Sequence, residues 1–454
     1  MGAYRRASGL AQAAGVSCLW GRFFIPCYNT CTRLPGEVTL YIKSLSVAHL
    51  RCFQEATITF QYPDKPSGGK TLANVNLLLG DNGSGKSTVL KAIALAALSP
   101  IMERSGYVPY YMVRRDQSES KIKAELILDR QELGATAHSA SSVQRVDTDI
   151  ITVGDYEEVH GMKRRQAWDA IFIEDSPGFL LLGYSTTRRV ESEEHFSPSS
   201  LQKSRRLRYQ RVAGLFEDQI ALTPLGAWLP RVKDERPGRF DEIAGLMNQL
   251  LSSEPFADEE QPRFSGELYR GEVLFQINRI AVPYSALSDG YRKYVAWTGD
   301  LLYHLHLSCP ESMKLAEMSG IVLLDEIDLH LHPEWQRHVV GTIASTLPKV
   351  QFIFSTHSPV VAGTVRAENI LVMEVDEDGA SHVRRFREQI FGKNADEVLQ
   401  SSYFGLETTR APGFVHELDS ISQRAYKGDP KAAIEFLKKL TSTGEPSAER
   451  DGSA

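Results

Sequence analysis

Residues 74–98, NVNLLLGDNGSGKSTVLKAIALAAL, decide the fold of this chain. The stretch opens with a short apolar run that stops at a cluster of glycines, which is typical of a buried strand. From Lys86 onward the pattern is that of a helix. Between the two, residues 80–88 match G-x-x-x-x-G-K-[ST], a loop that holds phosphate groups. Because strands and helices alternate over much of the chain, the sequence predicts an α/β fold with a mostly parallel sheet.

The residue types in this loop suit a nucleoside triphosphate with Mg²⁺. The glycines let backbone N–H groups curl around phosphate oxygens, and the helix that follows points its positive dipole end at them. Lys86 places a charge on the β- and γ-phosphates, and the Ser87 hydroxyl can bind Mg²⁺. The predicted nucleotide-binding residues of the loop are Gly80, Asp81, Asn82, Gly83, Ser84, Gly85, Lys86, Ser87 and Thr88.

A second stretch, GIVLLDEIDLHLHPEWQ at 320–336, supplies carboxylates. Its apolar start predicts a buried strand that ends at Asp325 and Glu326. Phosphoryl transfer needs an acidic group near the metal, and Asp325 can hold the hydration shell of Mg²⁺. Glu326 can orient or deprotonate the attacking water, so we expect it to be the general base.

The same stretch continues with Asp328, His330 and His332. Two histidines two residues apart beside a carboxylate can form a metal site. The alternative is a loop whose polar side chains fix its shape or contact another subunit.

Two further motifs complete the set. STHSP at 355–359 places His357 directly after an apolar strand, where a side chain can sense the γ-phosphate. LSDGYR at 287–292 places Ser288 and Gly290 at the start of a helix, where a hydroxyl and a backbone N–H can contact a phosphate. S-x-G is a common pattern, and its position about 35 residues before Asp325 is what makes it informative.

Composition is that of a globular protein. The chain has 454 residues, of which 42% are hydrophobic and 24% charged, and its formal net charge is −6. No apolar run reaches the roughly 18–20 residues of a membrane span. Five cysteines are too few for a disulfide scaffold of this length, so we expect a cytoplasmic protein.

Changes in residue composition and pattern along the chain predict five segments. Residues 1–36 form a basic leader without order, either a transit peptide or sequence translated from a start codon assigned too early. Residues 37–130 form a lobe with the phosphate loop, and 131–280 a mainly helical insertion. Residues 281–390 form a second lobe with the Asp-Glu strand and His357, and 391–454 a helical segment with a disordered tail.

A basic run within the insertion can bind nucleic acid or a partner protein, or can be a solvated helix face. Its cations are Lys203, Arg205, Arg206, Arg208 and Arg211.

Together and in this order, the four motifs resemble the ABC-type ATPase heads of the SMC/RecF/OLD group. LSDGYR, DEIDLHLHPEWQ and STHSP more narrowly resemble stand-alone bacterial AAA-family ATPases of anti-phage operons, such as the Septu ATPase. The resemblance spans about 38–410. It implies a P-loop NTPase with an ABC/SMC-like head, in which an antiparallel side sheet accompanies the mostly parallel sheet.

The resemblance also implies functions for particular residues. ATP with Mg²⁺ would be bound between two heads, and Ser288 and Gly290 of one head would complete the site of the other. Arg51 would lie near the nucleotide. Asp328, His330 and His332 would contact the partner head or fix the loop's shape. The signature departs from the family's LSGGQ-like form at Asp289 and Tyr291, and Gln117 is the candidate for the family's Q-loop glutamine.

The resemblance leaves three functions open. The first is a defence ATPase that controls a partner effector, for which a nuclease is expected. The second is a RecF-like DNA-binding repair ATPase, and the third a transporter's nucleotide-binding subunit. An intrinsic nuclease is not predicted, because the carboxylates of MEVDEDG at 373–379 lie in a predicted hairpin that turns at Asp378-Gly379.

Overall fold

The computed structural model describes residues 39–63, 65, 72–102, 107–128, 143–162, 180–190, 209–252, 262–269 and 272–442. The chain divides into two units, and these residues all lie in the second, Glu37–Ala454. Within these ranges, no helix is long and apolar enough to span a membrane. The leader, with Cys27 and Cys31, lies outside the described residues.

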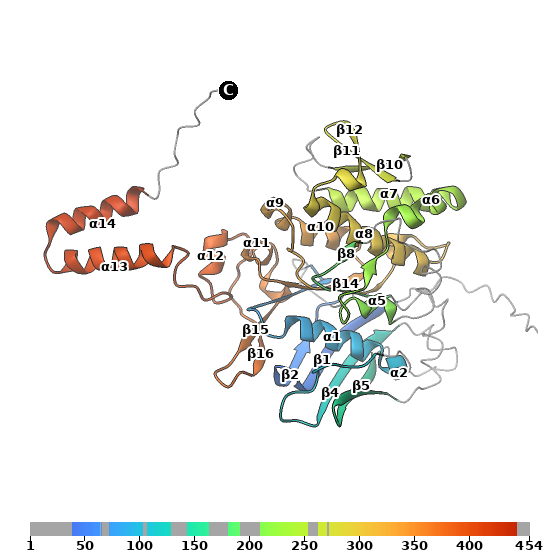
Figure 1. Cartoon of the computed structure of the whole chain (residues 1–454), viewed down its shortest axis with the longest axis horizontal. Helices are drawn as coiled ribbons and strands as arrows, with labels where there is room; N and C mark the ends of the chain where they lie inside the picture. The colour runs from blue at the N-terminus through green and yellow to red at the C-terminus, as the bar shows by residue number, and fades with distance from the viewer. Residues whose placement is uncertain are drawn as a thin grey trace, which may run out of the picture. The chain divides into compact units, whose positions relative to one another are not determined.

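A six-stranded sheet forms the centre of the described unit (Figure 1). Its strands run in the order β16-β15-β3-β14-β13-β7, and all neighbours are parallel except β15 and β16. Every residue of β13 and β14 is buried, in keeping with the unbroken apolar run of β13 and the mostly apolar sequence of β14. The strands are β3 (Val75–Gly80), β7 (Leu181–Tyr184), β13 (Gly320–Leu324), β14 (Val350–Thr356), β15 (Ile370–Val375) and β16 (Ser381–Arg384).

A second, antiparallel sheet has the order β2-β1-β4-β5-β6. Helix α1 (Lys86–Ala97) packs against strands of both sheets, so its apolar residues are buried on nearly all sides. The mostly parallel sheet with an antiparallel side sheet is therefore confirmed. The antiparallel strands are β1 (Leu40–Leu50), β2 (Phe53–Thr59), β4 (Glu119–Leu128), β5 (Val143–Val153) and β6 (Tyr156–Gly161).

Four helices share a hydrophobic core with the side of the parallel sheet that faces away from α1. Leu77 and Leu79 of β3 belong to this core, whereas Leu78 between them faces α1, as the alternation of a strand requires. Figure 1 shows α6, α7, α8 and α10 gathered on this side. These helices are α6 (Leu225–Glu235), α7 (Pro237–Leu251), α8 (Asp289–Ser308) and α10 (Val339–Thr346).

The prediction that 131–280 is mainly helical is wrong for the described residues, which form more strand than helix there. β5 and β6 extend the antiparallel sheet, and β7 is an edge strand of the parallel sheet. β5 and β6 are rich in charged residues and pair with each other, whereas the short strand β7 pairs with the distant strand β13. The remaining elements of this segment are α5 (Gln210–Ala213), β8 (Arg189–Val190), β9 (Ala221–Leu222), β10 (Arg263–Tyr269), β11 (Glu272–Ile277) and β12 (Ile280–Pro283).

The expected hairpin and the helical C-terminal segment are both present. β15 and β16 pair antiparallel, and Gly379 in their turn has φ +73°. Glu374 and Asp376 form ion pairs with Arg384 and His382 across the hairpin. The other helices are α2 (Ser99–Met102), α9 (Pro333–Gln336), α11 (Pro359–Ala362), α12 (Ala395–Leu399), α13 (Pro412–Tyr426) and α14 (Pro430–Ser442).

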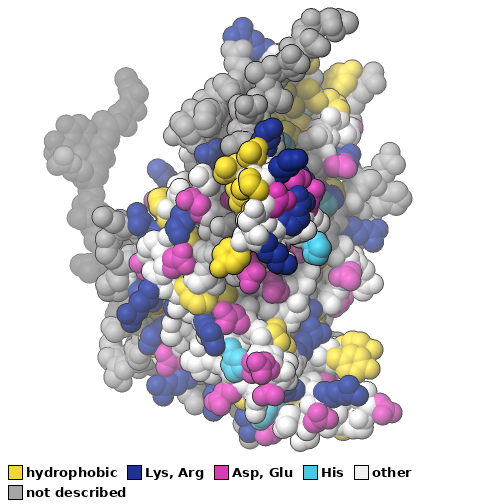
Figure 2. Space-filling model, turned by 90° about the vertical axis from the view of Figure 1, so that its left-hand side faces the viewer, with side chains coloured by type: hydrophobic (Ala, Val, Ile, Leu, Met, Phe, Trp, Pro, Cys, Tyr) yellow, Lys and Arg dark blue, Asp and Glu magenta, His cyan; other side chains and the backbone are white. Residues whose placement is uncertain are grey.

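Helices α13 and α14 pack against each other, and both have an apolar face. Leu418, Ile421 and Ala432 are buried, whereas Ile434 and Leu437 of α14 are exposed. Figure 2 shows the face of the molecule on this side, where hydrophobic side chains gather in a small area bordered by basic and acidic ones.

Candidate active site

The phosphate loop joins β3 to α1 in the predicted way, and its glycines are needed sterically. Gly85 precedes α1 at φ +102°, and a Cβ there would lie 2.7 Å from Cys52 Sγ and the Phe53 ring. A Cβ on Gly80 would lie 2.3 Å from the backbone oxygen of Met373. The hydroxyl of Ser84 is buried in the loop without a hydrogen-bond partner. The loop thus holds a polar group ready for a ligand that is a hydrogen-bond donor or acceptor.

Lys86 is held beneath the loop by the loop's own backbone. Its Nζ donates to the carbonyl oxygens of Gly80 and Asp81, each at 2.8 Å. Burial lowers the pKa of this lysine, while Asp325 and Glu326 oppose the shift. The ammonium is therefore positioned at the centre of the loop by contacts that a bound phosphate can replace.

The two predicted Mg²⁺ ligands lie together. Ser87 Oγ donates to Asp325 Oδ2 at 2.6 Å, although 238 residues separate them. Ser355 of β14 donates to the other carboxylate oxygen of Asp325, which fixes its orientation. A hydroxyl and a carboxylate that meet beside a phosphate loop are the oxygen ligands that Mg²⁺ takes in nucleotide sites, so these residues fit the ion.

Glu326 follows in an unusual backbone conformation. Its φ is +50°, in the left-handed region that residues other than glycine seldom adopt. Its N–H donates to Ser355 Oγ at 2.8 Å, and its carbonyl accepts from Arg188 at 2.5 Å. The half-buried side chain is thus attached to a turn whose backbone is held from both sides.

His357 comes directly after β14, the strand between those that carry the phosphate loop and Asp325. Thr356, the last residue of β14, pairs with Leu79 next to Gly80. Because the carboxyl ends of parallel strands meet at one edge, His357 shares that edge with Lys86 and Asp325. The structure is consistent with its predicted position, and its contact with the γ-phosphate stays a prediction.

The loop after Glu326 is fixed by contacts within the chain. Asp328 accepts a 2.5 Å hydrogen bond from Thr356 Oγ1, and His330 Nε2 lies 2.8 Å from Lys293 Nζ. His332 accepts from the N–H of Glu334 and so caps α9. In the parts of the chain that the structure describes, no three His, Cys, Asp or Glu side chains converge as metal ligands. These contacts are consistent with a function in fixing the loop's shape, and contact with a partner head stays a prediction.

The signature segment lies at the start of α8. Ser288 precedes the helix and is exposed, and its side chain makes no capping hydrogen bond. Gly290 is close-packed, since a Cβ there would lie 2.6 Å from the backbone oxygen of His330. Asp289 forms an ion pair with Arg292, so the negative charge that departs from the usual signature is compensated locally.

Two predicted positions lie at the margin of the site. The guanidinium of Arg51 donates to the backbone oxygens of Tyr110 and Tyr111, at 3.4 and 3.0 Å. Arg51 is two residues from Phe53, which borders the phosphate loop, and its contact with nucleotide stays a prediction. Gln117 is exposed before β4, and its assignment as the Q-loop residue also remains untested.

Of the basic run, Lys203, Arg205, Arg206 and Arg208 lie outside the described residues. Arg211 is described and donates to Ser308 Oγ at 2.9 Å at the end of α8. Burial lowers the pKa of this guanidinium. Arg211 is therefore part of the packing under α8 and is not a free cation for nucleic-acid phosphates.

Sequence reasoning assigned no functional residue to the segment after β7. β7 pairs in parallel with β13, so Thr186, Thr187 and Arg188 lie at the same sheet edge as Asp325. Arg188 is 8% exposed and donates to the backbone oxygens of both Asp325 and Glu326. Burial lowers its pKa to about 10 although three carboxylates favour its charge. The only available signal was FLLLGYSTTRR itself, an apolar run that ends in polar residues.

A mostly parallel sheet with a phosphate loop, a buried Asp-Glu turn and a serine-aspartate pair for Mg²⁺ defines a P-loop nucleotide-binding protein. Comparison with known proteins agrees. Residues 44–155 match the family described as AAA domain. Residues 187–363 match the family described as AAA domain, putative AbiEii toxin, Type IV TA system. Over these two ranges the chain is similar to AAA-domain proteins, and the matched ranges include Lys86, Ser87, Asp325 and Glu326.

Two relatives resemble most of the chain. Septu protein PtuA of Bacillus mycoides (strain KBAB4) is 26% identical over 375 residues, which are 81% of this chain and 45% of the relative. The chain thus spans less than half of that protein. Septu protein PtuA of Bacillus thuringiensis is 22% identical over 385 residues, which are 82% of this chain and 89% of the relative.

A solved structure with a similar fold is the SMC head bound to the C-winged helix domain of ScpA. It has a TM-score of 0.45 and 17% identity, and the match covers 76% of this chain and 97% of that one.

Proposed function

We propose that the chain hydrolyses ATP to ADP and phosphate between two copies of itself, and that this reaction controls a partner effector in bacterial anti-phage defence. One observation carries the ATPase proposal: Lys86, the Ser87–Asp325 pair and Glu326 lie at one sheet edge. Each of these positions presents the functional group that phosphoryl transfer requires there.

The residues suggest a sequence of events. When ATP binds, Lys86 exchanges a carbonyl partner for phosphate oxygens, and the backbone N–H groups of the loop bind the β-phosphate. Mg²⁺ held by Ser87 and Asp325 would neutralise charge on the phosphate oxygens. Glu326 accepts a proton from the water that attacks the γ-phosphorus, and the bond to the β-phosphate oxygen breaks to leave ADP. His357 contacts the γ-phosphate from the end of β14.

A second copy would complete the site. Ser288 is exposed, and its hydroxyl is not used to cap α8, so it remains available to a phosphate from outside the chain. The Arg292 partner of Asp289 removes the repulsion that an unpaired carboxylate would exert on that phosphate. Both features support the head-to-head arrangement that the resemblance implies.

The defence role is supported by the similarity to the two PtuA proteins over four fifths of this chain. We propose that the effector is a nuclease on a separate chain. ATP-dependent association of the heads would hold or release it. Glu374 and Asp376, two of the carboxylates in the 370–384 hairpin, form ion pairs within it, in keeping with a nuclease supplied by the partner.

Glu326→Gln tests the hydrolysis. Steady-state ATP turnover should fall by about 10²–10⁴-fold, the usual contribution of a general base, while ATP affinity stays near that of the wild type. Glu377→Gln, at an exposed carboxylate in the hairpin turn, is the matched control and should change neither quantity. Wild-type turnover in Glu326→Gln would refute the assignment of the base.

The defence role needs a separate experiment. Cells that carry the chain together with its neighbouring nuclease gene should resist phage, and Lys86→Ala should abolish that resistance at equal protein level. Equal resistance in the Lys86→Ala cells would contradict control by ATP. Salt-sensitive binding of the isolated chain to DNA, with no effect of a partner on phage resistance, would favour the RecF-like alternative instead.

A further inference from the structure

The loop after β7 holds a buried arginine that the reaction described above does not use. Arg188 is 8% exposed, and its neighbour Arg189 is exposed. A guanidinium is seldom taken out of water unless it makes specific contacts. The contacts of Arg188 are with the Asp-Glu turn: its Nη2 donates to the backbone oxygen of Asp325 at 3.2 Å and of Glu326 at 2.5 Å.

These two contacts act on the backbone of the candidate general base. Glu326 has φ +50°, which a residue with a Cβ adopts only where its surroundings enforce it. The Ser355 hydroxyl holds the N–H of Glu326, and Arg188 holds its carbonyl. With both ends of the residue fixed, the direction of the Cα–Cβ bond is fixed, and with it the region that the carboxylate can reach.

The charge of Arg188 matters as well as its shape. Asp325, Glu326 and Asp328 all act on this guanidinium. Three carboxylates near one turn repel one another, and a buried cation that contacts the backbone of the turn offsets that repulsion. Lys86 faces the same carboxylates from the phosphate loop.

We propose that Arg188 is a positioning residue that keeps Glu326 in the conformation required for hydrolysis. The proposal rests on the assignment of Glu326 as the general base. Arg188 would not touch the nucleotide and would act only through Glu326.

The same geometry connects the base to the surface expected to meet a second copy. Arg188, Lys293 and His330 line one small cavity between the β7 loop, the start of α8 and the loop after Glu326. His330 also touches the signature segment, since its backbone oxygen is the atom that a Cβ on Gly290 would meet. A movement of the signature segment on dimerisation could therefore be transmitted to Arg188 through His330 and Lys293.

A double-mutant cycle on the full chain tests the proposal. Arg188→Met should lower kcat at least tenfold, with KM for ATP and the affinity for a non-hydrolysable ATP analogue changed less than threefold. In the Glu326→Gln background, Arg188→Met should cause no further loss of turnover, because its effect passes through the missing carboxylate. Arg189→Met, at the exposed neighbour, is the matched control and should behave as wild type.

A general structural role for Arg188 would lower turnover equally in both backgrounds, and this result would overturn the proposal. Unchanged kcat in Arg188→Met would overturn it as well. If Arg188→Met does not fold, Arg188→Lys takes its place, since lysine keeps the charge but not the planar fork; the same cycle then applies. A wrong assignment of Glu326 as the base can be distinguished from a wrong assignment of Arg188, because in the first case Glu326→Gln alone would hydrolyse ATP at the wild-type rate.

Discussion

His304 is a titratable residue in the core of the described unit, on the helix that begins with the signature segment. It is 8% exposed, and its Nε2 lies 3.5 Å from Asp300 Oδ2. Asp300 also accepts hydrogen bonds from the Tyr184 hydroxyl at the end of β7 and from the N–H of Thr223. This buried network joins α8 to β7, the strand that leads into Arg188.

Burial lowers the pKa of His304 to about 4, and the charge of Arg211 acts in the same direction, while Asp300 opposes both. An unfolded histidine titrates near 6.5, so between these two values the unfolded chain binds a proton that the folded chain does not. Folding stability from this group is therefore lost as the pH falls from about 6.5 toward 4.

His304→Gln tests this directly. The free energy of unfolding, measured by urea denaturation at pH 7 and pH 5, should fall less on acidification in His304→Gln than in the wild type. The expected difference is on the order of 1–2 kcal/mol. His416→Gln, at an exposed histidine on α13, is the control. An identical pH dependence in His304→Gln and the wild type would show that His304 is not buried in its neutral form.

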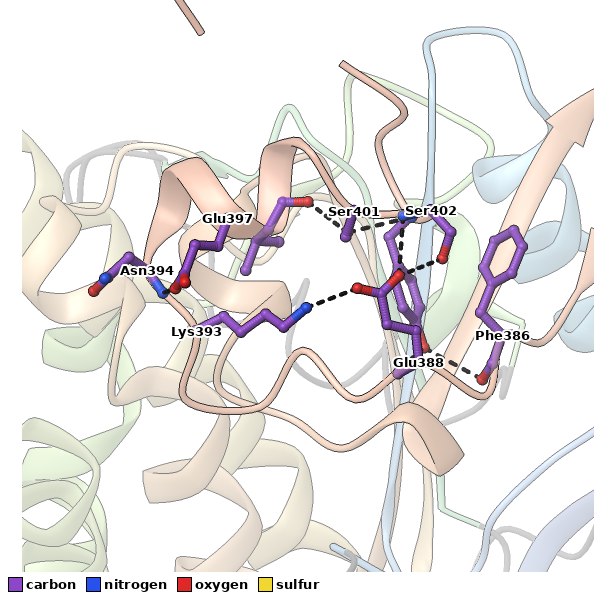
Figure 3. Close-up of polar contacts among 9 residues, drawn as sticks. Phe386, Glu388, Lys393, Asn394, Glu397, Ser401 and Ser402 are labelled. Carbon is purple, nitrogen blue, oxygen red and sulfur yellow. Dashed lines mark hydrogen bonds and ion pairs between the residues drawn. The ribbon is translucent and has the colours of Figure 1, made fainter. Parts of the chain in front are cut away.

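At the level of elements, the carboxylate of Glu388 joins the segment before α12 to the segment after it. Glu388 accepts from Lys393 Nζ at 2.7 Å and from both the N–H and the hydroxyl of Ser402 (Figure 3). Its own backbone oxygen accepts from the Tyr403 hydroxyl at 2.8 Å. Lys393 and Ser402 lower the pKa of Glu388 to about 2. The carboxylate therefore stays ionised and closes the loop that leads to α12.

Glu388→Gln should loosen this loop, because the neutral amide loses the ion pair with Lys393 and is a poorer acceptor for Ser402. We expect amide hydrogen exchange to become faster in 386–404 and to stay unchanged in β13 and β14. Glu377→Gln serves again as the exposed control. Unchanged exchange in 386–404 would mean that other contacts hold the loop.

The elements also show what the sequence could predict. The strand, glycine loop and helix at 74–98 are local patterns, and the structure confirms them. The apolar runs that became β13 and β14 are equally local, because a strand buried on both faces carries its own signal. The carboxyl ends of β3 and β13, the two neighbours of β14 in the sheet, then place Ser87 and Asp325 together.

The contacts that could not be predicted are those between distant segments. Arg188 is separated from Asp325 by 137 residues, and its burial depends on the pairing of β7 with β13. In the sequence, Arg188 cannot be distinguished from the arginines that lie at the surface. The strands β10 to β12 were missed for a different reason, since they are short and pair with their own neighbours in sequence without a strong apolar alternation.

On the scale of the whole molecule, the proposed shared site has two parts, which lie at different places on the described chain. The phosphate loop, Asp325 and Glu326 form one part at the edge of the parallel sheet. Ser288 forms the other part at the exposed start of α8. If the site is shared between two copies, a copy with a defective phosphate loop and a copy with a defective signature segment can together form one intact site.

Mixing of two inactive variants tests this claim most directly. Lys86→Ala removes the phosphate-loop cation, and Ser288→Arg blocks the signature segment without touching the close contact at Gly290; each variant alone should lack ATP turnover. The account predicts that turnover reappears when the two are mixed, because the intact phosphate loop of one copy meets the intact signature of the other. Mixtures that remain as inactive as the separate variants, while the wild type hydrolyses ATP, would contradict the shared site.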